Sequence, residues 1–111
     1  MTGGWITPAD RARWQQRAAA ELAAILAAHP DMPVIAWTVT ASGGALSGRV
    51  LAPAGGRRGL FGRWRQALGL DEVTKTPSAT GAPVYLRARG VRGGVAVSVS
   101  ATVFDEAEDD R

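Results

Sequence analysis

The stretch PVIAWTVTASGGALSGRVLAP, residues 33–53, decides the fold, because it joins two apolar-rich runs through a pair of glycines. Gly43-Gly44 suits a two-residue hairpin turn, whose central residues need positive φ angles. This turn places Ser42 opposite Ala45, and the register follows outward from there. One face then holds the pairs Ala41–Leu46, Val39–Gly48, Trp37–Val50 and Ile35–Ala52, and the other holds Thr40–Ser47, Thr38–Arg49 and Ala36–Leu51. Because strand side chains alternate between two faces, this separation of apolar from polar residues predicts a β-hairpin.

A second stretch, PVYLRARGVRGGVAVSVSATVF at residues 83–104, follows the same pattern around Gly93-Gly94. Its apolar face pairs Gly90–Val97, Ala88–Val99, Leu86–Ala101 and Val84–Val103. Its polar face pairs Arg89–Ser98, Arg87–Ser100 and Tyr85–Thr102. The two glycine-pair hairpins together predict four antiparallel strands.

A long helix is expected before the first hairpin. Thr7 suits the N-cap, Pro8 the first turn and Asp10 the third position of a capping box. Apolar residues then recur at helical spacing at Trp14, Ala18, Leu22, Ile25 and His29. Pro30 ends the helix, since it disfavours helical geometry at the residue before it. We therefore expect His29, the single histidine, at the helix C-terminus, where the dipole favours it, and not as a ligand.

A shorter amphipathic helix is expected between the hairpins, within GGRRGLFGRWRQ at residues 55–66 and the residues after it. Its apolar positions are Leu60, Phe61, Trp64, Ala67 and Leu68. Gly62 costs about 1 kcal/mol relative to alanine, so this helix depends on docking against the sheet. Gly69 suits its C-cap. The following residues 71–82, DEVTKTPSATGA, read as a surface loop.

These elements predict an α+β domain over residues 1–104 in the order α-β-β-α-β-β. Its four-stranded antiparallel sheet has both helices packed on one face, because both hairpins need their apolar side covered. Residues 105–111 form an acidic tail, expected to be disordered, that holds five of the ten acidic residues; residues 1–104 carry a net charge of +7. We expect the tail to aid solubility, or alternatively to compete for the basic surface of the domain.

The composition removes several classes of function. The chain has no cysteine and one histidine, which excludes disulfides, cysteine nucleophiles and sites with two histidines. The acidic residues of residues 1–104 fall at helix ends, on helix faces or in loops, where capping and solvation explain them. The glycine pairs lack the spacing of nucleotide-binding motifs. We therefore predict no catalytic residue, metal or cofactor. Without a secretory signal or an apolar run of about 20 residues, a cytoplasmic protein is expected.

Two basic surfaces are the candidate sites. The first is a cluster on the loop and short helix, made of Arg57, Arg58, Arg63 and Arg65. Cationic side chains beside a helix N-terminus suit phosphate. The second is the face of the sheet without helices, where Arg49, Arg87 and Arg89 stand among hydroxyl groups. For both, the alternative is ordinary solvated surface, since arginine supplies 12 of the 13 basic residues.

The sequence thus predicts a small non-enzymatic binding module, with nucleic acid slightly favoured and bound through its phosphates. Sheets that bind RNA usually stack bases on several aromatic residues, and Tyr85 alone weakens the prediction of single-strand binding. The alternative is a protein-interaction, accessory or chaperone-like protein, including a homodimer, that uses the open sheet or an edge strand. Membrane insertion of Phe61 and Trp64 is not expected, because it would leave the sheet uncovered.

Overall fold

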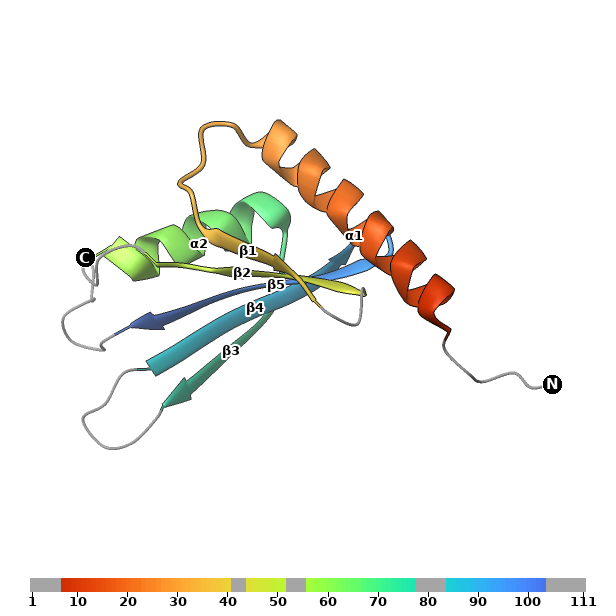
Figure 1. Cartoon of the computed structure of the whole chain (residues 1–111). Coiled ribbons are helices and arrows are strands. Elements are labelled where there is room, and N and C mark those ends of the chain that lie inside the picture. The colour runs from red at the N-terminus through yellow and green to blue at the C-terminus, as the bar shows by residue number, and fades with distance from the viewer. Residues whose placement is uncertain (1–6, 41–43, 52–55, 78–83, 104–111) are drawn as a thin grey trace.

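The computed structural model describes residues 7–40, 44–51, 56–77 and 84–103 of the 111. Seven elements follow one another as α1 (Pro8–Ala28), β1 (Ala36–Val39), β2 (Ala45–Arg49), α2 (Arg57–Leu68), β3 (Glu72–Pro77), β4 (Val84–Arg92) and β5 (Val95–Val103). They form an α+β fold with a five-stranded sheet in the order β1-β2-β5-β4-β3 (Figure 1). The α+β class is confirmed. The acidic segment expected as a tail lies outside the described residues.

The expected four-stranded antiparallel sheet is wrong because the two hairpins meet in parallel. β2 pairs with β5 in the same direction, with Ser47 opposite Ser98 and Arg49 opposite Ser100. The amide of Val50 extends this contact by donating to the carbonyl oxygen of Ser100 at 2.9 Å. The apolar pattern of a hairpin shows which of its faces is buried, but not which of its edges meets a neighbour. The parallel pairing makes β5 the central strand of a mixed sheet.

The fifth strand, β3, corrects the prediction of a loop at residues 71–82. Residues 72–77 pair antiparallel with β4, from Glu72 opposite Arg89 to Pro77 opposite Val84. The strand lies at the edge of the sheet, and even Val73 is 43% exposed. A strand with no buried side lacks the alternation of apolar and polar residues that marks the others. Only its β-branched residues, typical of strands, could have indicated it.

The β4–β5 hairpin has the expected register throughout, from Arg92 opposite Val95 to Val84 opposite Val103. Its turn residues Gly93 and Gly94 have φ angles of 58° and 79°. Positive φ at both central positions is the requirement of a type I′ turn, which glycine meets without strain.

The β1–β2 hairpin is paired two residues away from the expected register. Trp37 lies opposite Gly48, and the amide of Thr40 donates to the carbonyl oxygen of Ala45 at 3.0 Å. Thr40 and Ala45 therefore still belong to the paired strands, and Gly43 of the expected turn lies outside the described residues. A Cβ on Gly48 would lie 3.1 Å from the Trp37 ring and 2.8 Å from Ile35 Cδ1. The observed register thus places a large ring over a residue without a side chain, and a two-residue shift keeps every side chain on its face.

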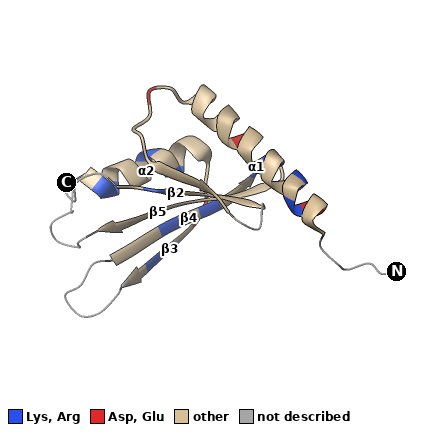
Figure 2. Cartoon of the chain, in the orientation of Figure 1, with Lys and Arg blue, Asp and Glu red and all other residues tan. Residues whose placement is uncertain are grey.

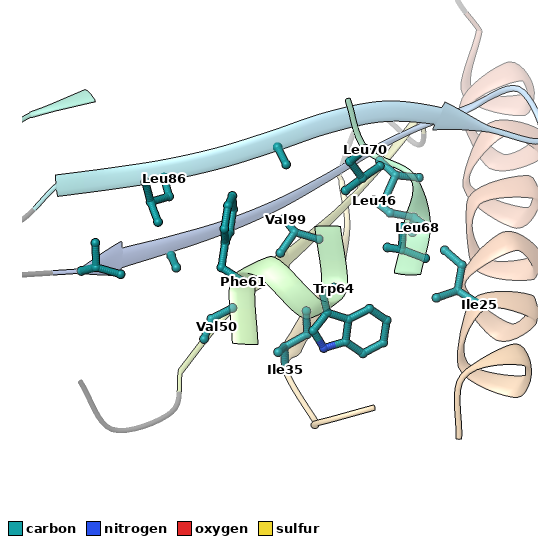
Figure 3. Packing of buried hydrophobic residues seen from close by; sticks show 14 of the residues in the cluster. Ile25, Ile35, Leu46, Val50, Phe61, Trp64, Leu68, Leu70, Leu86 and Val99 are labelled. Carbon is teal, nitrogen blue, oxygen red and sulfur yellow. The ribbon is translucent and has the colours of Figure 1, made fainter. Parts of the chain in front are cut away.

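Both helices pack on one face of the sheet, as expected (Figure 1). α2 buries Phe61, Trp64 and Leu68 against the strands. In Figure 3, Phe61 points from α2 toward β4 and β5, and Trp64 lies beside Ile35. The indole Nε1 of Trp64 donates to the carbonyl oxygen of Pro33 at 2.9 Å. These contacts confirm that the aromatic residues of α2 cover the sheet.

α1 has the predicted caps, but only part of its predicted apolar side is buried against the rest of the fold. The capping box of Thr7 and Asp10 is present, and His29 is the C-cap. Ala18 and Ile25 are buried, whereas residues 11–17 are exposed where the red half of α1 extends past the sheet in Figure 1. The helix is therefore held mainly through its C-terminal half.

Candidate anion-binding face of the sheet

The sheet face turned away from the helices is the candidate site, and it is called the open face below. The pairing register places side chains on it in cross-strand rows. Its polar members are Thr38, Ser47, Arg49, Glu72, Thr74, Thr76, Tyr85, Arg87, Arg89, Ser98, Ser100 and Thr102. Figure 2 shows basic residues on β2 and β4 of this sheet as well as on both helices. The open polar face predicted from the two hairpins is thus present, widened by β3.

One row of the open face brings two arginines together. Arg49 on β2 and Arg87 on β4 both lie opposite Ser100 on the central strand β5. Two strand spacings put their Cα atoms roughly 10 Å apart. Within the described part of the chain, neither guanidinium makes a hydrogen bond or an ion pair. Their positive charges and donor groups are therefore available to an anion from solution.

β5 forms the floor of a trough between these arginines. Its open-face residues are the small Ala96, Ser98, Ser100 and Thr102. Ser98 and Ser100 are only 9% exposed although they face away from the core. Arg89 stands beside Ser98, and Arg49 and Arg87 stand on either side of Ser100. Two hollows lie along this trough, of about 370 Å³ near Arg87 and Arg89 and about 620 Å³ near Arg49 and Tyr85. The face can therefore receive an extended ligand.

The third arginine of the open face is already paired. Arg89 Nη2 lies 2.6 Å from Glu72 Oε2, across the β3–β4 pairing. Both side chains are substantially exposed, so the pair adds little stability, about 1 kcal/mol at most. It nevertheless offsets the charge of Arg89. Glu72 was missed as part of this face, because residues 71–82 were expected to form a loop.

The four arginines of α2 do not form one cluster. Arg57 Nη1 donates to the carbonyl oxygen of Thr102 at 3.0 Å, which ties the start of α2 to β5. Arg58 is half-buried beside it. Arg63 and Arg65 are exposed but stand about 200° apart around the helix, since successive residues rotate by about 100°. The seven predicted site residues thus divide between two layers, with Arg49, Arg87 and Arg89 together on the open face.

Arg92, which the sequence did not single out, fixes the end of the central hairpin. Its Nη1 donates to the carbonyl oxygen of Leu68 at 3.3 Å, near the C-terminus of α2. Its Nε lies 3.6 Å from Glu21 Oε2 on α1. Glu21 also sits so close to the turn that a Cβ on Gly93 would lie 2.5 Å from its Oε1. Arg92 is therefore engaged in joining both helices to the hairpin that carries the floor of the trough.

The described residues hold no group of three or more histidine, cysteine or acidic side chains placed to bind a metal ion. Neither helix of the described chain has the length and apolar character needed to cross a membrane. No protein-family model and no curated protein sequence matches the chain. The function of the chain must therefore be inferred from the site itself.

Proposed function

We propose that this chain binds nucleic acid through the open face, with Arg49 and Arg87 neutralising backbone phosphates. The observation that carries the proposal is the row in which these two arginines flank Ser100 without an acidic partner in the described chain. Guanidinium groups match the oxygens of a phosphate, and hydroxyl groups supply further donors. Such contacts hold the backbone without reading its sequence.

The character of the open face favours a polyanion over a protein partner. Protein interfaces are usually most apolar at their centre, with charged residues depleted there. Here the centre of the open face consists of serines between arginines. The exposed apolar residues are not gathered there: Leu51 lines one of the two hollows and Val91 lines the other. The chain carries a net charge of +3, with +7 on residues 1–104, and a positive charge speeds the approach of a polyanion.

The test compares two pairs of exposed arginines. Arg49→Gln/Arg87→Gln and Arg63→Gln/Arg65→Gln remove the same charge, the first from the open face and the second from α2. Affinity for a labelled oligonucleotide is measured by fluorescence anisotropy over a range of salt concentrations. The open-face variant should bind about tenfold more weakly, and its slope of log affinity against log salt should be shallower by roughly 1 to 2.

The α2 variant should show the smaller loss. A larger loss in the α2 variant would move the site to the helix layer. Failure of the natural chain to bind any oligonucleotide, even at low salt, would contradict the proposed function itself.

A further inference from the structure

We infer that the open face takes single-stranded nucleic acid, with one unpaired base seated against Tyr85 in the hollow that Tyr85 shares with Arg49. The inference rests on the proposed function. It adds that the nucleic acid is single-stranded and that Tyr85 is the residue that distinguishes a single strand from a duplex. It follows from the shape and lining of the larger hollow, beside the row of two arginines.

Two planar side-chain groups, a phenol ring and a guanidinium, line the hollow on either side of the small residues of β5. Tyr85 on β4 and Arg49 on β2 line it, and β5 runs between them with Ser100 on the floor. The side chain of Tyr85 is 42% exposed. The hollow has a volume of about 620 Å³ and is open to solvent. A flat group can therefore enter beside the phenol ring while the chain attached to it follows the trough.

These groups have the chemistry that unpaired bases require. Bases stack on aromatic rings and also on guanidinium planes, so Arg49 provides the second planar surface that a count of aromatic residues overlooks. The hydroxyls of Thr38, Ser47 and Ser100 line the same hollow. A hydroxyl both donates and accepts, so this lining can bond to the edge of any base. The hollow therefore suits bases in general and not one sequence.

Arg49 and Arg87 lie close enough to this hollow to contact phosphates of the same nucleic-acid strand. Tyr85 lies opposite Thr102, two residues along β5 from Ser100 and the row of Arg49 and Arg87. Two residues of a strand span roughly 7 Å. A base in the hollow thus lies next to the charges of Arg49 and Arg87, which have no acidic partner among the described residues. A duplex can place phosphates on these arginines, but its paired and stacked bases cannot enter the hollow.

Three probes test the inference by fluorescence anisotropy: a short single strand, its duplex, and an abasic strand of equal length that keeps only the phosphates. We expect the natural chain to bind the single strand about tenfold more tightly than the abasic strand, given the usual strength of base stacking. Tyr85→Thr should lose this tenfold preference, whereas its affinity for the abasic strand and the duplex should stay unchanged. Tyr85→Phe keeps the ring and should bind as the natural chain does.

The outcomes separate the two proposals. If single, abasic and duplex probes bind equally and Tyr85→Thr changes none of them, the base contact is wrong while phosphate binding stands. If Tyr85→Thr weakens all three probes alike, Tyr85 acts on the face as a whole, and the inference is likewise wrong. If no probe binds the natural chain, the proposed function and the inference fall together. Equal thermal midpoints of the three proteins show that the fold is intact.

Discussion

Arg49 and Arg87 lie on one cross-strand row of the sheet, on either side of Ser100. They belong to different hairpins, and the parallel pairing of β2 with β5 brings them into the same row. The strand order β1-β2-β5-β4 places β2 and β4 on either side of the central strand β5. The topology therefore creates the candidate site.

Gly48 should be intolerant of a side chain. Its substitution by alanine places a Cβ 2.8 Å from Ile35 Cδ1 and 3.1 Å from the Trp37 ring, so these core residues must shift. We predict a loss of about 1 to 3 kcal/mol in the free energy of unfolding, measured by urea denaturation. Gly62→Ala is the control, since a Cβ there meets nothing within 4 Å. It should instead stabilise the chain by up to about 1 kcal/mol. Equal effects of the two changes would contradict the observed packing of Trp37.

Glu72 should restrain nucleic-acid binding. Glu72→Gln removes the carboxylate that lies 2.6 Å from Arg89 and so adds a third available arginine to the open face. We predict an affinity a few times higher, with a steeper dependence on salt. Asp71→Asn changes the net charge equally, next to Glu72 but outside this ion pair. An equal gain from both variants would show a general effect of charge, without a role for Arg89.

The capping box predicts a dependence of stability on pH. The amide of Thr7 donates to Asp10, and the Thr7 hydroxyl and Arg13 also favour the ionised carboxylate, so the pKa of Asp10 is lowered from its usual 3.8. A lowered folded-state pKa stabilises the fold above the usual value, and this contribution disappears as the pH falls through the folded-state pKa. Asp10→Asn should therefore have a lower thermal midpoint than the natural chain at neutral pH. The difference should shrink on acidification below 3.8; a difference that grows there would contradict the capping role.

The acidic segment at residues 105–110 should weaken nucleic-acid binding. It begins two residues after Val103, the end of the strand that floors the trough, and carries five negative charges. Carboxylates attached to the chain at this point would compete with phosphates for Arg49 and Arg87 at low salt. We predict that truncation after Phe104 raises the affinity for an oligonucleotide in the anisotropy assay. Unchanged affinity at low salt would rule out competition by this segment.

Local sequence patterns predicted those parts of the fold that depend on local chemistry. The register of β4 and β5 follows from Gly93-Gly94 and strict alternation, and the start of α1 follows from Thr7 and Asp10. The register of β1 and β2 instead depends on where the Trp37 ring finds space over Gly48. Such packing, like the pairing of β2 with β5, arises only when distant segments meet.

In the candidate site, too, local sequence predicts some features, whereas others depend on contacts between distant segments. All three arginines of the open face could be placed there from alternation alone. Their availability could not, since it depends on whether a partner such as Glu72 arrives from another strand. In the same way, the bond from Arg57 to the backbone of Thr102 distinguishes it from the exposed arginines of its helix. A count of charges in the sequence treats all of them alike.

The most direct test of the proposed site is an NMR titration that follows the side-chain Nε–H signals of the arginines as an oligonucleotide is added. We predict that the signals of Arg49 and Arg87 shift in proportion to the bound fraction, together with the amides of Ser98 and Ser100. The signals of Arg63 and Arg65 should move little. Shifts confined to Arg63 and Arg65, with Arg49 and Arg87 unchanged, would contradict the assignment of nucleic-acid binding to the open face.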